Sequence, residues 1–224
     1  MILETQTSTP LQNYKILSNT ITPRPIAWVS TSFPNGTINL APFSFFAPLS
    51  VNPPIFAICM MQKSDGTHKD SYKNILDTRK ATISMCESTH LNALHSTSAE
   101  LGYNMSEAVE FDIELEVLKS GFPPVPKGVK VAFMCNLYDV LELGENKSVL
   151  LKVDSFYIAD EIYQQDLKFL PHFIGRVGRI YKLPGAELIP TEHTPKDTNA
   201  LATYAQNQHL QTQPIQVEQG RDDE

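Results

Sequence analysis

Small hydroxyl and amide residues stand close to prolines in the first quarter of the chain, where apolar runs begin or end. They are Ser30, Thr31, Asn39, Ser44 and Ser50. Proline has no backbone N–H and restricts the residue before it, so nearby backbone groups can be left without a partner in a sheet. Such groups suit the polar rim of a planar heteroaromatic ligand, and hydroxyls beside a Lys or Arg suit a phosphate.

A structural alternative explains the same residues. The segment 39–54, NLAPFSFFAPLSVNPP, is strongly apolar but contains Pro42, Pro48, Pro53 and Pro54. A paired central strand avoids proline, whereas an edge strand uses proline to block further pairing. The residue types alone favour the ligand site and the protected edge equally.

Other familiar chemistry is missing from the sequence. It contains no G-x-G-x-x-G, no P-loop, no H-E-x-x-H and no G-x-S-x-G motif. Cys59, Cys86 and Cys135 each lie in an apolar run and are interpreted as buried small hydrophobes. His90 and His95 are five residues apart, a poor spacing for two ligands on one helix face. The sequence therefore predicts no metal site and no catalytic side chain.

Composition limits the possible partners and compartments. The 224 residues are 42% hydrophobic and carry a net charge of −7, which argues against a nucleic-acid-binding surface. The N-terminus lacks the basic and apolar regions of a signal peptide. No apolar run approaches the roughly 20 residues needed to span a bilayer. We therefore expect a cytoplasmic protein without membrane partners.

The chemical groups are expected to lie on a largely antiparallel β structure. Apolar or alternating runs predict strands at 26–31, 37–46, 55–61, 81–86, 109–118, 129–137 and 148–158. Asn35-Gly36 predicts a tight turn between the first two strands. Short helices are expected from Asp70-Ser71 and over 89–99. Because strands and helices do not alternate regularly, the pattern favours a barrel or sandwich with peripheral helices.

The composition changes near the C-terminus. Residues 191–224 are rich in Gln, Thr and charge and poor in core residues. We expect one domain over residues 1–190, followed by a polar tail that is flexible or packed on a neighbouring subunit.

Several motifs together resemble one protein family. They are PRPIAWVST (23–31), NLAPFSFF (39–46), KDSYKNI (69–75) and PHFIGRVGRIY (171–181), in the same order and within Leu11–Leu183. This ordered set is similar to the flavin reductase-like, FMN-binding split-barrel family, which includes flavoredoxins and nitrilotriacetate monooxygenase component B. Ser71 stands where the family often has Thr, and Arg179 replaces the second Gly of the terminal motif.

The resemblance implies a mostly β fold: a Greek-key type split β-barrel with peripheral helices. It also implies FMN bound noncovalently at the interface of a homodimer. The main chain along the flavin ring would be that of Asn39, Leu40, Ala41, Pro42, Phe43 and Ser44. The phosphate would be held by Ser30, Thr31, Ser50, Lys69 and Ser71, with Arg24 as a further candidate.

The implied activity is that of an NAD(P)H-dependent flavin reductase, in which FMN accepts hydride from NAD(P)H. Reduced FMN would pass electrons to an oxygenase or another electron acceptor. A flavin-binding electron carrier or redox sensor without turnover is the alternative, and a split barrel that has lost its ligand is a third possibility.

Overall fold

The computed structural model describes residues 2–144, 146–164, 168–169 and 172–185. The chain divides into two units, Met1–Pro184 and Gly185–Glu224, and the fold described here is that of the first unit. The tail predicted at 191–224, and with it the predicted domain boundary near residue 190, lies outside the described residues.

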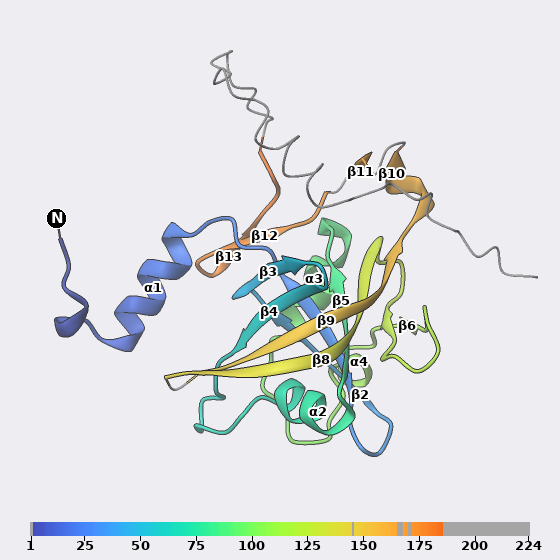
Figure 1. Cartoon of the computed structure of the whole chain (residues 1–224), viewed down its shortest axis with the longest axis horizontal. Helices are drawn as coiled ribbons and strands as arrows, with labels where there is room; N and C mark the ends of the chain where they lie inside the picture. Colours follow the sequence, from blue (N-terminus) through green and yellow to red (C-terminus); the bar gives the residue numbers. More distant parts are fainter. Residues whose placement is uncertain (1, 145, 165–167, 170–171, 186–224) are drawn as a thin grey trace, which may run out of the picture. The chain divides into compact units, whose positions relative to one another are not determined.

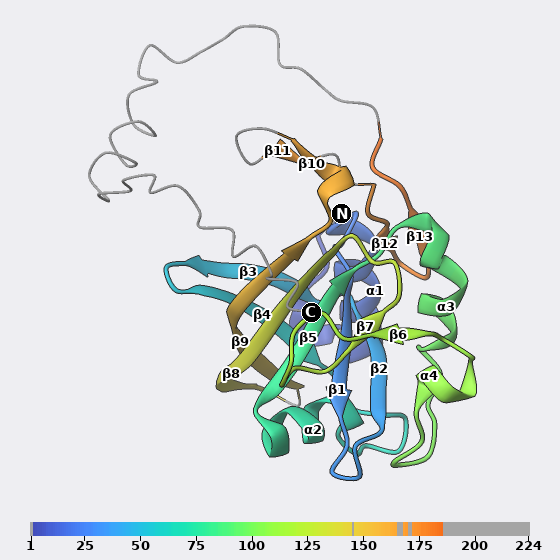
Figure 2. The ribbon, with the colours of Figure 1, turned by 90° about the vertical axis from the view of Figure 1, so that its right-hand side faces the viewer.

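A seven-stranded antiparallel sheet forms the body of the unit (Figures 1 and 2). Its strand order is β2-β1-β5-β8-β9-β4-β3, so β2 and β3 are the two edges. The strands are β1 (Ala27–Ser32), β2 (Ile38–Phe43), β3 (Phe46–Val51), β4 (Pro54–Met60), β5 (Lys80–Met85), β8 (Val131–Leu143) and β9 (Asn146–Ile158). The mostly β architecture with peripheral helices is therefore confirmed.

Short elements surround this sheet. The helices are α1 (Pro10–Thr20), α2 (Asp70–Thr78), α3 (Leu91–Ser96) and α4 (Glu107–Glu110), with 3-10 turns η1 (Thr5–Thr7), η2 (Ser88–His90) and η3 (Asp160–Ile162). Two-stranded pairs are β6 (Leu115–Glu116) with β7 (Val125–Pro126), β10 (Tyr163–Gln164) with β11 (Lys168–Phe169), and β12 (Gly175–Val177) with β13 (Ile180–Lys182). Helix α2 packs on β1 and β2, while α3 and α4 lie beside β2 (Figure 2).

The predicted first hairpin is confirmed. Gly36 has a φ of 86°, a conformation that glycine adopts without steric cost. The Phe33 N–H donates to the Thr37 carbonyl at 2.9 Å and closes the turn between β1 and β2. The register then places Thr31 opposite Asn39 and Ser30 opposite Leu40. This pairing brings two of the predicted site strands together.

Alternation along β1 and β2 divides the apolar residues between two cores. Ala27 and Val29 belong to the larger core, which β4, β5, β8, β9 and α2 complete. Trp28 and Leu40 point the other way, into a second core that Leu94 of α3 and Ile174, just before β12, complete. Both strands therefore contribute one face to each core, which fixes their register firmly.

Three local expectations differ from the structure. The strand expected over 109–118 is wrong: α4 occupies Glu107–Glu110, and only Leu115–Glu116 is extended and paired there. The strand expected over 37–46 is divided, because β2 ends at Phe43 and β3 begins at Phe46. The helix expected from Asp70-Ser71 is present, but Lys69 is its N-cap residue.

Helix α1 is an element that the sequence reasoning did not predict. The Thr9 hydroxyl accepts from the Gln12 N–H at 3.2 Å, and the Gln12 side chain accepts from the Thr9 N–H at 2.8 Å. Pro10 occupies the first helical position, where a missing N–H costs nothing. No helix among the described residues is long and apolar enough to cross a membrane.

Candidate functional site

The free edge of β2 shows why proline is tolerated in this segment. The Leu40 N–H points away from β1 and donates to Glu107 Oε2 at 2.9 Å. Pro42 lies two residues further along the same strand. Alternate residues of an edge strand turn their N–H groups outward, so Pro42 occupies a position whose N–H would lack a strand partner.

Glu107 is held at this edge by the start of α4. The Ser106 hydroxyl caps the helix by accepting from the Val109 N–H at 3.4 Å, and it donates to the Ile38 carbonyl at 2.5 Å. Glu107 is only 6% exposed, and burial raises the pKa of its carboxyl above the usual range. The nearby carboxylate of Asp70 acts in the same direction. The Leu40 N–H, which the resemblance assigns to a ligand, therefore donates to a buried acid of the chain itself.

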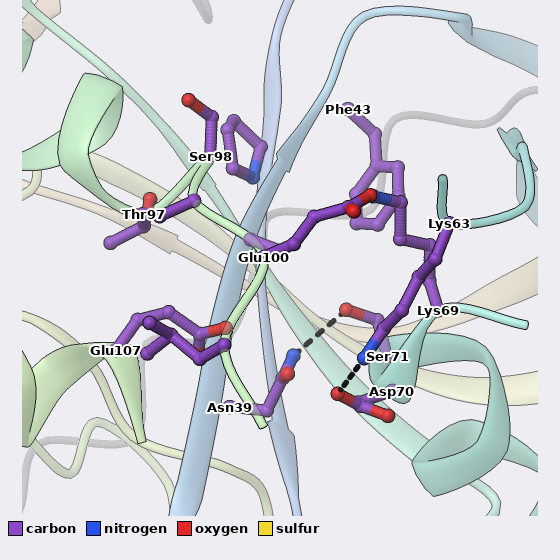
Figure 3. A pocket seen from close by; sticks show the side chains of 14 residues that line it. Asn39, Phe43, Lys63, Lys69, Asp70, Ser71, Thr97, Ser98, Glu100 and Glu107 are labelled. Atoms are coloured by element: carbon purple, nitrogen blue, oxygen red, sulfur yellow. Dashed lines mark hydrogen bonds and ion pairs between the residues drawn. The ribbon is translucent and has the colours of Figure 1, made fainter. Parts of the chain in front are cut away.

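Amide and hydroxyl side chains join the start of α2 to the strands. Asn39 Nδ2 donates to Ser71 Oγ at 2.8 Å, and both side chains are buried (Figure 3). Asn74 Nδ2 donates to Thr31 Oγ1 at 3.1 Å, also in the interior. These two bonds fix the position of the helix start, and with it the position of Lys69.

The cations at the site are paired with carboxylates. Lys63 Nζ lies 2.7 Å from Asp70 Oδ2, and Lys69 Nζ lies 2.7 Å from Glu100 Oε1. With Glu107, the site holds two ammonium groups and three carboxyl groups. An incoming anion must therefore compete with carboxylates that the chain itself supplies.

These groups line one pocket (Figure 3). Its walls come from β2, the start of α2, the loop after α3 and the first residue of α4. The lining residues are Asn39, 41–43, Lys63, 69–71, 97–101 and Glu107. The pocket therefore combines apolar strand surface with hydroxyl, amide and ammonium donors. Such a set suits a planar apolar ligand with an anionic group.

Half of the predicted site residues line this pocket: Asn39, Ala41, Pro42, Phe43, Lys69 and Ser71. Leu40 contributes its backbone to the Glu107 contact, while its side chain lies in the second core. Thr31 lies beneath the pocket and accepts from Asn74. Ser30 is fully buried, and its hydroxyl has no hydrogen-bond partner among the described residues.

The other three predicted residues lie elsewhere. Arg24 is 5% exposed and donates to the carbonyls of Ser18 and Gly178 and, at 3.4 Å, to Ser44 Oγ. Ser50 lies on β3, the opposite edge of the sheet. The described chain does not bring these residues to the pocket. The predicted phosphate contacts of Arg24 and Ser50, and the predicted ring contact of Ser44, stay predictions.

Sequence reasoning missed Lys63, Glu100 and Glu107. Glu107 follows Ser106, and a Ser followed by acidic residues is a recognised helix-start signal. No comparable local signal marks Lys63 or Glu100, whose contacts join segments distant in the sequence. Among the described residues, no group of three or more His, Cys, Asp or Glu side chains could hold a metal ion. Cys86 and Cys135 are buried as predicted, and Cys59 is half-buried.

The fold and pocket define a mostly β protein whose pocket combines apolar strand surface with hydroxyl, amide and ammonium donors. The chain belongs to the family of the flavin reductase like domain, whose sequence model matches residues 19–178. The predicted family is thereby confirmed. Membership supports a redox function that involves a flavin.

Individual relatives agree with this assignment. An uncharacterized protein of Aquifex aeolicus is 31% identical over 173 residues, covering 75% of this chain and 87% of the relative. Nitrilotriacetate monooxygenase component B from Bacillus cereus has a TM-score of 0.80 at 24% identity, covering 85% of this chain and 98% of that one. An FMN-binding protein from Thermus thermophilus has a TM-score of 0.70 at 16% identity, covering 85% and 100%. A putative flavin reductase with a split barrel domain from Shewanella frigidimarina has a TM-score of 0.74 at 18% identity, covering 87% of this chain and 100% of that one, and this similarity confirms the predicted split-barrel fold.

Proposed function

We propose that the chain is an FMN-binding flavoprotein and acts as an oxidoreductase that transfers hydride from NAD(P)H to FMN. The observation that carries the proposal is the donor set at the start of α2, next to the apolar edge of β2. Lys69 and Ser71 supply an ammonium and a hydroxyl there, while Ala41, Pro42 and Phe43 supply apolar surface. Family membership and the structural similarity to the FMN-binding protein from Thermus thermophilus support the same cofactor.

One group of residues would contact the phosphate of FMN, and another would contact its ring. Lys69 Nζ would neutralise the phosphate charge. Ser71 Oγ accepts from Asn39, and its hydroxyl proton goes to no protein acceptor among the described residues, so it is available to a phosphate oxygen. Charge-assisted bonds of this kind are stronger than neutral ones. FMN binding is noncovalent in this proposal.

The flavin ring would lie along β2. Because Pro42 has no N–H and the Leu40 N–H is bonded to Glu107, the strand offers fewer backbone donors than its sequence suggests. Ring recognition would therefore rest on apolar contact with 41–43 and on backbone carbonyls. Bound FMN supplies the two-electron chemistry, with NAD(P)H as the donor. The chain's part is to orient the ring and exclude water, and no side chain is assigned as a catalytic acid or base.

A homodimer belongs to the same proposal. Leu49 and Val51 on the edge strand β3 are 58% and 87% exposed. Exposed apolar side chains gathered on one region of a surface mark an interface. Sedimentation at micromolar concentration would show a dimer, and a monomer would overturn this part. An oxygenase or another soluble electron acceptor in the cytoplasm is the proposed partner.

The test begins with the purified full-length chain. A yellow protein whose released pigment is FMN, or quenching of FMN fluorescence on titration, supports cofactor binding. Steady-state oxidation of NADH or NADPH with added FMN then tests turnover. Flavin binding without turnover would point to an electron carrier or redox sensor. A protein that neither holds nor quenches FMN would overturn the proposed function.

A further inference from the structure

The Glu100 carboxylate is held like a bound anion. Lys69 Nζ lies 2.7 Å from Oε1, the Ser64 hydroxyl donates to Oε2 at 2.6 Å, and the Ser64 N–H reaches both oxygens at 3.3 Å. The Lys69 ammonium and the Ser64 hydroxyl lower the pKa of Glu100 to about 2. One ammonium, one hydroxyl and one backbone N–H therefore converge on a single oxyanion.

The backbones that carry these donors are positioned without help from Glu100. Ser64 belongs to a closed turn, in which Lys63 N–H donates to the Thr67 carbonyl at 2.8 Å and Gly66 N–H donates to the Lys63 carbonyl at 3.0 Å. Asp65 Oδ1 accepts from both the N–H and the hydroxyl of Thr67, at 2.9 and 2.7 Å. Lys69 is fixed as the N-cap residue of α2. If Glu100 moved away, the turn would keep the Ser64 backbone N–H in place, and the Lys69 ammonium would be released to bond another anion.

The carboxylate is also easy to replace. The side chains of Lys69 and Glu100 are 28% and 37% exposed. Ion pairs at such exposure contribute only about 0–1 kcal/mol, because water competes for both charges. A phosphate monoester carries about −1.5 to −2 charges near pH 7 and has three acceptor oxygens. It therefore satisfies these donors better than one carboxylate does.

We propose that Glu100 occupies the binding position of a ligand's phosphate monoester and competes with it for Lys69 and Ser64. Glu100 then sets how strongly the site discriminates phosphorylated from unphosphorylated ligands. The proposal rests on the proposed function in so far as the ligand is a flavin. Figure 3 shows Glu100 and Lys69 side by side at the pocket that holds the Ser71 hydroxyl.

Two ligands carry the required group. FMN has a terminal phosphate that riboflavin lacks, and NADPH has a 2′-phosphate that NADH lacks. The shared chemistry is a phosphate monoester dianion. Comparing each ligand with its unphosphorylated partner therefore identifies which one competes with Glu100.

The primary variant is Glu100→Gln in the full-length chain. Binding is measured by fluorescence titration with FMN, riboflavin, NADPH and NADH. We expect the affinity for one phosphorylated ligand to rise about threefold to tenfold, with its unphosphorylated partner unchanged within about twofold. The matched control is Glu114→Gln, because Glu114 pairs with Lys127 at the same 2.7 Å distance but lies outside this pocket. The control is expected to change none of the four affinities.

A second substitution tests competition rather than general electrostatics. In a Lys69→Ala background, Glu100→Gln should give less than about half of its former gain, because the contested ammonium is gone. An equal gain with and without Lys69, or no gain for either phosphorylated ligand, overturns the proposal. If Glu100→Gln does not fold, Ser64→Ala serves instead. It should weaken binding of the phosphorylated ligand alone by about threefold, and an unchanged affinity overturns the proposal.

The two proposals fail in different ways. If neither the wild type nor any variant binds FMN or riboflavin, the proposed function fails. The NADPH and NADH titrations would still test whether Glu100 competes with a ligand's phosphate. If FMN binds and supports turnover but Glu100→Gln changes neither pair of ligands, only the competition is wrong.

Discussion

Arg24 and Lys69 are the two cations that the family resemblance places near a phosphate. They differ in the groups that balance their charges. Arg24 is 5% exposed and donates to carbonyl oxygens of Ser18 and Gly178, at the end of α1 and in the β12–β13 hairpin. Lys69 is half-buried and faces a carboxylate that is itself 37% exposed. One cation is bound by fixed backbone groups, and the other by a side chain that can leave.

On the proposed function, this difference separates a structural cation from a cation available to a ligand. Carbonyl oxygens are part of the backbone and cannot withdraw without local unfolding, so Arg24 joins three segments of the chain. Its backbone also exchanges two hydrogen bonds with Arg176, at 2.9 and 2.8 Å. A carboxylate on a half-exposed side chain is exchanged by rotation alone. The kind of group that pairs with a cation therefore indicates the role of that cation better than the choice of Arg or Lys does.

The largest expected effect is on stability and concerns Arg24, the cation bound by backbone carbonyls. Arg24→Gln removes donors from buried carbonyls and should lower the free energy of unfolding by about 2–4 kcal/mol, measured by urea denaturation. Arg179→Gln, at an exposed position in the turn next to Gly178, is the matched control and should cost little. In the fraction that folds, the preference for FMN over riboflavin should persist. A stable variant that loses this preference would place Arg24 at the cofactor instead.

A smaller effect is expected on the ligand side. Lys69→Ala should weaken FMN binding by about tenfold and leave riboflavin binding unchanged within about twofold, because a charge-assisted bond to phosphate is lost. The free energy of unfolding should change by less than about 1 kcal/mol. Lys127→Ala removes a comparable ion-paired lysine away from the pocket and should leave both affinities unchanged. Parallel losses for FMN and riboflavin would contradict a phosphate contact.

The smallest effect concerns the buried acid at the edge of β2. Burial raises the pKa of Glu107, so the folded chain binds its proton more tightly than the unfolded chain does. The free energy of unfolding should therefore fall as the pH rises from the ordinary glutamate pKa of 4.5 through the raised folded value. Below this pH window, Glu107 is protonated in both states and its burial carries no cost of ionisation. Above the window, that cost is constant.

Glu107→Gln tests this dependence because its amide oxygen can still accept from the Leu40 N–H. Unfolding in urea between about pH 4 and pH 8 should show that the variant loses less stability than the wild type as the pH rises. Glu110→Gln changes an exposed residue of the same helix and is the control. Identical pH profiles for the wild type and Glu107→Gln would show that Glu107 contributes no such penalty.

Local patterns were sufficient for most of the sheet. The alternation over 129–137 and the run at 148–158 predicted β8 and β9, although β8 continues to Leu143 and β9 begins at Asn146. Pairing between the two strands extends them beyond their apolar residues, which no single-strand pattern indicates. Helix α1 was missed despite its capping box, since Ser18 is its only buried residue and an apolar face was not apparent.

The site was predictable only where motifs run along single elements. Asn39 and Ser71 lie on segments that the motifs covered, and the fold joins them. Glu100 and Glu107 come from a stretch whose position over β2 depends on tertiary contacts. Ser50 is close to the motif in sequence but lies across the sheet, because β3 pairs with β4 and not with β2.

The single tryptophan of the chain gives this site an intrinsic optical probe. Trp28 is fully buried, and its indole N–H donates at 2.9 Å to the hydroxyl of Thr97, three residues before Glu100. If Glu100 leaves Lys69 by side-chain rotation, the indole keeps its partner and its emission stays constant. If the loop lifts as a whole, the bond breaks and the emission shifts. Titrating inorganic phosphate, which is transparent at these wavelengths, thus distinguishes the two motions without a label.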